Sequence, residues 1–385
     1  MTSHRSHSSH SSHSVKHTPL NAAHQKLGAK LIEFGGWEMP VYYTSIIEEH
    51  QAVRTAAGLF DISHMGEIRL RGVAALEFLN SVLTNDLRKL PSGQGQYTLL
   101  CNEKGGVVDD LYAYRIDAEE FLLIVNASRI EADVLWLEEQ LAGYNKREGV
   151  ELKNVSDDFG AVAVQGPKVA AFIDDCFEEN PLVASCLRKN EFARVHFSGQ
   201  TVFVSRTGYT GEDGFEVVAP AQITAALWNK MLDAGRPFGL KPAGLGARDT
   251  LRTEACYPLY GHELDENTTP IEAGLGFFVA LEKGDFTGRA VLAEQKATGT
   301  AKKLAAFRMA AHSPPPRPHY PIVKAGRPER IGEVTSGTHS PTLRMAIGLG
   351  YVPPQFAAPN TPIDIEIRGK PMPAVVMPKP FYRKS

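Results

Sequence analysis

Hydrophobic residues recur at two spacings along this chain, and the longer spacing predicts helices. Apolar side chains return every three or four positions over residues 46–58, 74–87, 130–141 and 221–235. Ser45 with Glu48, and Ser128 with Glu131, stand three residues apart just before two of these segments. That spacing is typical of a capping box, in which the serine hydroxyl accepts a backbone N–H of the first turn. We therefore expect both serines to begin helices.

The shorter spacing predicts strands, and it raises a question at residues 102–110, NEKGGVVDD. Strand formers lie on both sides, and Gly105 with Gly106 supplies the turn, so a β-hairpin is predicted. Strict alternation places Asp110 on one face with Val108, Tyr112, Tyr114 and Ile116. The other face then carries Val107, Asp109, Leu111, Ala113 and Arg115. A carboxylate among apolar and aromatic neighbours is costly unless something binds to it.

The order of the elements indicates a mixed α+β fold with a separate C-terminal part. Up to residue 151 the pattern predicts a split-βαβ unit that contains the hairpin. Residues 161–235 resemble it weakly, with a strand, a helix holding Pro167 in its first turn, a second hairpin and another helix. After residue 285, short strands punctuated by Gly and Pro predict an all-β barrel or jelly roll.

Composition and charge exclude several classes of function. The 385 residues carry a net charge of -3, which does not suggest a nucleic-acid surface. No apolar run reaches the roughly 20 residues that span a bilayer. The four cysteines are far apart, so neither a zinc site nor a disulfide framework is expected. The Ser/His-rich residues 1–17 predict a disordered tail, whose histidines, His4, His7, His10 and His13, can bind a metal only opportunistically.

Three further segments carry candidate ligand-binding residues. RTGYTGEDGFE, residues 206–216, combines glycines every third position with a tyrosine and several carboxylates. Residues 244–261 place Arg248 and Arg252 a turn apart if they are helical, although surface salt bridges are the plainer interpretation of each arginine. Residues 262–276 read as an acidic loop. Together they suit a ligand with an apolar ring, N–H donors and an anionic tail, such as a pterin with a benzoyl-glutamate or another heteroaromatic acid.

Eight segments occur in an order that resembles the aminomethyltransferases, the T-proteins of the glycine cleavage system. They are FGGWEMPVYY, AAGLFDISHMGEI, LTNDL, NEKGGVVDDL, VQGP, RTGYTGEDGFE, GLGARDTLRTEA and GHELDENTTPIEAGLGF. The resemblance implies a three-domain cloverleaf around a central folate channel. It implies a first α+β domain from residues 18–55 and 152–284, a second from 56–151, and an all-β domain from 285–385. The family passes an aminomethyl group from the dihydrolipoyl arm of H-protein to tetrahydrofolate, which yields methylenetetrahydrofolate and ammonia.

The same resemblance implies roles for individual residues. Asp110, the second acid of the GGxxDD motif, corresponds to the essential aspartate. Tyr209, Glu216 and Arg248 correspond to ligand positions. The residues that match the lining of the pterin and benzoyl pocket are Met65, Tyr97, Asn126 and Tyr257. A family tyrosine that binds substrate corresponds to Phe381 or Tyr382, and Tyr382 is the candidate.

Two alternative functions fit the resemblance less well. Folate-dependent modules of dimethylglycine or sarcosine oxidising enzymes are fused to a flavin domain, for which this chain has no length left. Non-catalytic folate-binding paralogues carry a cysteine in a KGCYxGQE-type motif, whereas the loop here reads RTGYTGEDGFE. The weak match of the tail to a transit peptide favours a bacterial cytoplasm over a mitochondrial matrix.

Overall fold

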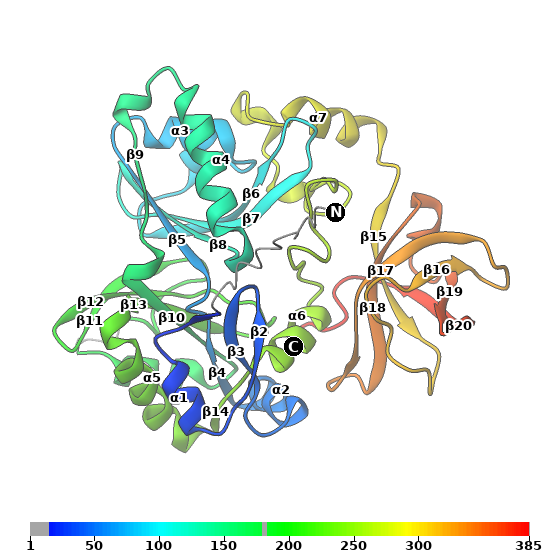
Figure 1. Ribbon diagram of the computed structural model, residues 1–385, viewed down its shortest axis with the longest axis horizontal. Coiled ribbons are helices and arrows are strands. Elements are labelled where there is room, and N and C mark those ends of the chain that lie inside the picture. The colour runs from blue at the N-terminus through cyan, green and yellow to red at the C-terminus, as the bar shows by residue number, and fades with distance from the viewer. Residues whose placement is uncertain (1–14, 179–182, 385) are drawn as a thin grey trace, which may run out of the picture.

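The computed structural model describes residues 15–178 and 183–384, and these form three lobes (Figure 1). The predicted tail lies outside the described residues up to Ser14. Lys16 and His17, however, form β1 (Lys16–His17), which pairs in parallel with β3 (Trp37–Tyr42). The prediction of a disordered tail over residues 1–17 is therefore wrong for Lys16 and His17. β3 also pairs with β2 (Lys30–Phe34) in this small three-stranded sheet.

Two larger sheets share one order of strands. One runs β6 (Gln94–Cys101), β7 (Val107–Arg115), β8 (Glu120–Val125), β5 (Gly66–Arg71) and β9 (Glu151–Asn154). The other runs β11 (Phe192–Phe197), β12 (Gln200–Ser205), β13 (Gly214–Pro220), β10 (Phe159–Gln165), β4 (Ala57–Asp61) and β14 (Leu240–Pro242). In chain order each sheet contains a first strand (β5 or β10), a hairpin (β6–β7 or β11–β12), a fourth strand (β8 or β13), then a helix and a last strand (β9 or β14). In the six-stranded sheet, β4 is inserted between the first and the last strand. The weak repeat in the sequence is thus a repeat of topology.

Helix boundaries follow the hydrophobic pattern better than the capping pattern. The helices are α1 (Asn21–Lys26), α2 (Ile46–Thr55), α3 (Ala75–Val82), α4 (Ile130–Ala142), α5 (Ala221–Gly235), α6 (Leu245–Glu254) and α7 (Arg289–Thr298). Ser45 caps α2 as predicted, since its hydroxyl accepts the Glu48 N–H at 3.2 Å. Ser128 does not cap α4, because the 3-10 turn Ala127–Arg129 precedes that helix.

Pro167 does not open an α-helix either. The chain after β10 instead makes two short 3-10 segments, Val169–Ala171 and Ile173–Cys176, whose apolar side chains fill the core of the six-stranded sheet. The prediction of a helix there was wrong. Segments of three or four residues are too short to offset the cost of nucleating an α-helix.

The C-terminal sheet closes into a barrel. Its order is β15 (Lys303–Met309), β18 (Met345–Val352), β17 (Arg330–Ser340), β16 (Pro321–Lys324), β19 (Pro362–Ile367) and β20 (Lys370–Met377). The predicted mixed α+β fold with an all-β C-terminal barrel is therefore confirmed.

The lobes divide the chain at other positions than the sequence analysis expects. β4 pairs with β10, so residues 57–61 join the six-stranded sheet although they were placed with the second domain. Leu264 and Leu292 pack with Leu99 and Cys101 of β6, so the chain around α7 covers the hairpin of the five-stranded sheet. The division into three domains remains a proposal in its details.

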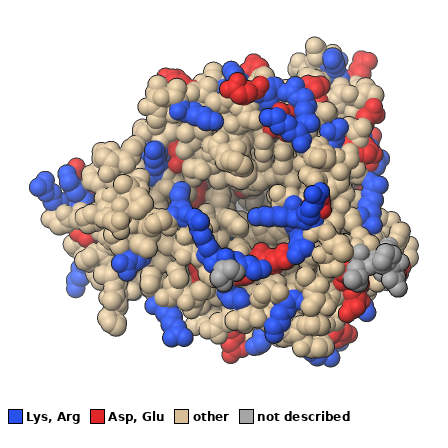
Figure 2. Space-filling model, turned by 180° about the vertical axis from the view of Figure 1, so that it is seen from behind, with Lys and Arg blue, Asp and Glu red and all other residues tan. Residues whose placement is uncertain are grey.

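One face of the molecule is hollowed near its middle, and Lys and Arg side chains gather on the rim of the hollow (Figure 2). Among the described residues, no helix is long and apolar enough to cross a membrane.

Candidate active site

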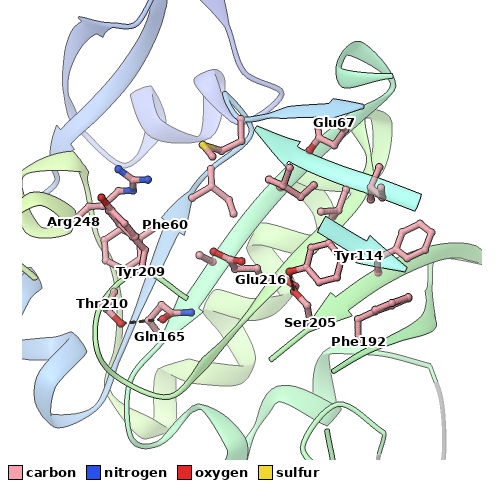
Figure 3. Close-up of a pocket in the computed structure, with 18 of the residues that line it drawn as sticks. Phe60, Glu67, Tyr114, Gln165, Phe192, Ser205, Tyr209, Thr210, Glu216 and Arg248 are labelled. Carbon is pink, nitrogen blue, oxygen red and sulfur yellow. Dashed lines mark hydrogen bonds between the residues drawn. The ribbon is translucent and has the colours of Figure 1, made fainter. Parts of the chain in front are cut away.

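A pocket of about 810 Å³, its open mouth included, lies between the faces of the two large sheets. The six-stranded sheet contributes residues of β4, β10, β11, β12 and β13, and the five-stranded sheet contributes β5, β7 and β8. Most of the lining is apolar or aromatic. The charged or amide side chains in it are Glu67, Gln165, Glu216 and Arg248 (Figure 3). A concave apolar site with a few polar groups is the usual form of a small-molecule site.

Arg248 and Glu216 are the two charged groups that the sequence analysis assigned to the ligand. Arg248 lies on α6, and its guanidinium stacks 4.5 Å from the centre of the Tyr209 ring. It makes no ion pair within the described residues. Glu216 lies on β13 and accepts a hydrogen bond of 2.6 Å from the Thr207 hydroxyl. Burial raises the pKa of Glu216. Arg248 and Glu216 thus offer a cation and an acid to a ligand.

A β-bulge changes the faces of the hairpin strand that carries Asp110. The register of β6 and β7 shifts between Leu100 and Cys101. Val107 consequently packs with Leu99 and Cys101, whereas Val108 joins Leu100 in the opposite core. The sequence analysis assigned these two valines to the wrong faces, because a bulge puts two residues opposite one.

Asp110 remains on the face that it shares with Tyr112 and Tyr114, and Tyr114 lines the pocket. The Tyr97 hydroxyl donates to Asp110 Oδ2 at 2.8 Å, and the Asn126 amide donates to Oδ1 at 3.0 Å. Burial, and then the charge of Asp109, raise the pKa of Asp110 to about 7, although both hydrogen bonds oppose the shift. An acid with a pKa near neutrality can exchange a proton under physiological conditions.

Asp109 lies on the other face of β7 and is fully buried. It accepts the Asn126 backbone N–H at 3.0 Å and the Asn126 side-chain amide at 2.8 Å. Asn126 therefore holds both neighbouring aspartates, from its place between β8 and the turn that precedes α4. The 3-10 turn Ala127–Arg129 follows Asn126 directly, so Ser128 lies within this turn and α4 starts after it.

The structure brings most of the predicted site residues together. Met65, Tyr209, Glu216 and Arg248 line the pocket, while Tyr97 and Asn126 hold Asp110. Tyr209 connects the two groups, since it lines the pocket, and burial and then the nearby charge of Asp110 raise the pKa of its hydroxyl. Its hydroxyl donates to the Pro258 carbonyl. Tyr257 lies behind it, with ring centres 5.7 Å apart.

Tyr382 does not line the pocket. Its ring covers the guanidinium of Arg54 at 3.8 Å, and its backbone N–H donates to the Glu254 carbonyl of α6. Phe381 turns the other way and packs against Leu304 and Leu349 of the barrel. Of the two C-terminal candidates, Tyr382 is thus the one beside the 206–216 loop.

Arg252, and His262 at the start of the acidic 262–276 segment, have structural partners. Arg252 is buried and ion-paired with Glu263 at 2.8 Å. The exposed ring of His262 contacts the Thr335 carbonyl. No group of His, Cys, Asp and Glu within the described ranges could hold a metal ion.

Glu67 and Gln165 also line the pocket. The sequence analysis named neither as a site residue, although they lie in the segments AAGLFDISHMGEI and VQGP that carry the resemblance. Glu67 alternates with Arg69 and Arg71 along β5, like any strand residue that faces solvent. It is nevertheless 2% exposed, and burial raises its pKa. Only the second sheet, which covers this face of β5, makes Glu67 a pocket residue.

The raised pKa of Asp110 predicts a pH-dependent contribution to stability. The folded-state pKa is about 7 and the unfolded one 3.8, so between these values the folded state holds a proton that the unfolded state has released. This contribution is full below the unfolded value and is lost as the pH rises through about 7. We expect the midpoint of thermal unfolding to fall more steeply with pH for the wild type than for Asp110→Asn. Parallel curves for the two proteins would contradict the assignment.

Comparison with known proteins identifies the family. A family model described as the GCVT N-terminal domain matches residues 20–283, and one described as the glycine cleavage T-protein C-terminal barrel domain matches 302–383. The aminomethyltransferase of Bacillus cereus (strain ZK / E33L) is 48% identical over 374 residues, which cover 97% of this chain and 99% of that protein. The aminomethyltransferase of Bacillus mycoides (strain KBAB4) is 47% identical over 377 residues, with the same coverage.

A solved structure agrees with these sequence matches. The crystal structure of glycine cleavage system aminomethyltransferase T from Bartonella henselae aligns with a TM-score of 0.88 at 34% identity, over 96% of this chain and 98% of that one. The chain therefore belongs to the aminomethyltransferases of the glycine cleavage system, the T-protein family.

Proposed function

We propose that the pocket between the sheets binds tetrahydrofolate and that Asp110 acts on the reacting edge of this substrate. The observation that carries the proposal is the position of Asp110. It is an acid of raised pKa, held by Tyr97 and Asn126, on the strand face that leads to the pocket wall at Tyr114. The one-carbon donor in this proposal is the aminomethyl-dihydrolipoyl arm of H-protein. The bacterial relatives support a cytoplasmic location.

The proposed reaction exchanges two bonds at one carbon. The C–N bond to the departing amine and the C–S bond to the lipoyl arm break, and two C–N bonds to tetrahydrofolate form. The two folate nitrogens lose one proton each. One of these protons goes to the amine, which leaves as ammonia, and the other goes to the sulfur. Asp110 is placed to accept and pass on such a proton, and in its ionised form it stabilises positive charge that develops near the folate nitrogens.

The pocket supplies complementary groups for a pterin and its tail. Glu216 can accept N–H donors of a pterin edge, which would favour its ionised form. Arg248 has a fork of donors and no ion-pair partner in the described residues, so it can hold a polar or anionic edge. The rim of Lys and Arg side chains around the hollow in Figure 2 suits a substrate with an anionic tail. Holding two substrates in register can account for about 7–11 kcal/mol of the barrier.

The direct test uses H-protein loaded with the aminomethyl group. We expect rapid ammonia release and formation of methylenetetrahydrofolate when tetrahydrofolate is present, and slow release without it. A non-catalytic folate-binding protein would bind tetrahydrofolate without accelerating either step. That result would reject the proposed function.

Arg248→Met is expected to weaken tetrahydrofolate binding by about 10- to 100-fold, the range for losing a hydrogen bond to a charged group. Met keeps most of the side-chain length over the Tyr209 ring but removes the donors. Calorimetric titration measures the change. Arg308→Met, which alters an exposed arginine of β15, is the matched control and should bind like the wild type. Equal affinities for all three proteins would exclude Arg248 from the site.

A further inference from the structure

Glu67 is a buried acid of the pocket that the proposed reaction does not use. Its side chain lines the pocket, although the residue is only 2% exposed. Among the described residues, none donates a hydrogen bond to its carboxyl group, and the nearby Ser156 hydroxyl contacts only the backbone of Glu67. A polar group that is taken out of water without a partner destabilises a protein. We therefore expect a ligand to complete the surroundings of this acid.

The side chains around Glu67 leave it in an apolar space. Ile124 lies opposite Glu67 in the pairing of β5 with β8, and Leu122 and Ile116 line the pocket on the same sheet. Glu216 approaches the pocket from β13 of the other sheet (Figure 3). A second acid is no donor for the first when both are ionised. The space beside Glu67 thus suits a ligand that is largely apolar and brings its own N–H group.

The strand register fixes where Glu67 lies relative to Asp110. Asp110 and Tyr112 point to one face of β7. Tyr112 lies opposite Ile124 of β8, and Ile124 lies opposite Glu67 of β5. Residues directly opposite one another share a face, so Glu67 is on the face of Asp110, two strands across and two residues along. Strands about 4.8 Å apart, with a rise of about 3.4 Å per residue, put the two Cα atoms about 12 Å apart.

A reduced pterin has the length and the donors to connect these two acids. The proposed function places the reacting nitrogens of tetrahydrofolate, which lie in and beside one ring of the pterin, at Asp110. The 2-amino group is carried by the other ring, at the far end of the fused pair. Two fused six-membered rings with a hydrogen bond at each end fill a separation of this order. In Figure 3, Arg248 and Tyr209 lie at one end of the pocket, and Glu67 lies toward the other end.

We propose that Glu67 is a specificity-determining acid of the pocket and that it accepts an N–H of the 2-amino group of the reduced pterin. This inference rests on the proposed function, because it takes the direction of the pterin from Asp110. The carboxyl group gains a partner only from a ligand that carries this donor. A ring without the amino group leaves the acid buried and unpaired, and a site of this kind rejects such a ring.

The test compares tetrahydrofolate with its 2-deamino analogue, in which a hydrogen replaces the amino group. We expect the wild type to bind tetrahydrofolate about 10- to 100-fold more tightly than the analogue, the range for a hydrogen bond to a charged group. Glu67→Met keeps the length of the side chain without an acceptor, so this preference should disappear through weaker binding of tetrahydrofolate. Glu67→Gln keeps a carbonyl oxygen, and a preference of about 3- to 10-fold should remain. Calorimetric titration of both ligands measures these values.

Two control variants show whether the effect belongs to Glu67. Glu151→Met alters an exposed acid of β9 in the same sheet and should bind both ligands like the wild type. Glu216→Met should bind both ligands more weakly and keep the preference for the 2-amino group. If Glu216→Met loses the preference while Glu67→Met keeps it, the amino group belongs to Glu216 and the inference is overturned.

Two further measurements separate recognition of the ligand from a structural role. Glu67 does not touch the reacting atoms in this proposal, so Glu67→Met should raise the KM for tetrahydrofolate while kcat stays within about threefold of the wild type. The substitution removes an unpaired acid from an apolar space, so the midpoint of thermal unfolding should be unchanged or higher. A lower midpoint, together with equal weakening of both ligands, would assign Glu67 to the fold alone and overturn the inference.

The outcomes also distinguish this inference from the proposed function. A wild-type protein that does not bind tetrahydrofolate, or wild-type turnover in Asp110→Asn, would reject the proposed function. Normal turnover by the wild type, together with a preference for the 2-amino group that survives in Glu67→Met, would reject only the role of Glu67.

Discussion

Asp110→Asn is expected to lower kcat by about 100- to 10,000-fold, the range in which general acid–base groups contribute. The amide keeps the shape of the side chain, but it can neither take up a proton at neutral pH nor offer a negative charge to the folate nitrogens. The Tyr97 hydroxyl and the Asn126 amide, which now donate to the carboxylate, hold the asparagine near the same place. We therefore expect the affinity for tetrahydrofolate to stay within about threefold of the wild type. An interaction made only in the transition state lowers kcat when it is lost and leaves binding of the ground state unchanged. Ammonia release from loaded H-protein, followed beside calorimetric titration of tetrahydrofolate, measures both quantities.

Asp117→Asn is the matched control for this change. Asp117 follows the same strand, is exposed, and accepts the Glu119 backbone N–H at 2.9 Å, which an asparagine can still accept. It should turn over like the wild type. Asp109→Asn is a poor control, although it appears the natural one in the sequence, because Asp109 is fully buried and holds Asn126. If Asp110→Asn and Asp117→Asn lose the same small amount of activity, Asp110 has no part in the chemistry.

The sequence predicted the elements whose signals are local. α5 ends at Gly235 as expected, because fifteen residues with one apolar stripe need no information from elsewhere in the chain. The bulge in the hairpin could not be predicted from the sequence, since it depends on the pairing of β6 with β7 rather than on either strand alone. Ser128 does not cap α4, and this too was not visible in the local sequence. Asn126 donates hydrogen bonds to Asp109 and Asp110 of β7, and Ser128 lies in the 3-10 turn that follows Asn126.

The candidate site was predictable where a residue contradicts its surroundings. Asp110 was singled out because an acid stands on an apolar strand face. Glu67 could not be found in this way, because its burial comes from the second sheet across the pocket. Local patterns thus reveal misplaced charges, whereas pocket walls built from two sheets need the fold.

The buried ion pair of Arg252 joins α6, which carries Arg248, to the barrel. Arg252 is 1% exposed and contacts Glu263 at 2.8 Å and the Ser336 hydroxyl of β17 at 2.7 Å. Glu263 is also buried, and it accepts the Leu259 backbone N–H and the Thr335 hydroxyl. The sequence placed Arg252 and Arg248 on one helix face, and the fold gives them different partners.

Arg252→Met is therefore expected to lower the free energy of unfolding by about 3–5 kcal/mol, because it leaves the Glu263 carboxylate buried without its cation. Urea titration followed by fluorescence measures the change. Arg236→Met removes an arginine of an exposed pair with Asp233 and should cost about 0–1 kcal/mol. Replacing both partners, Arg252→Met with Glu263→Leu, should cost less than the sum of the two single changes, since no charge is then stranded. An equal loss of unfolding free energy in Arg252→Met and Arg236→Met would mean that burial does not strengthen the Arg252–Glu263 pair. The contact between α6 and the barrel would then be stabilised by apolar packing alone.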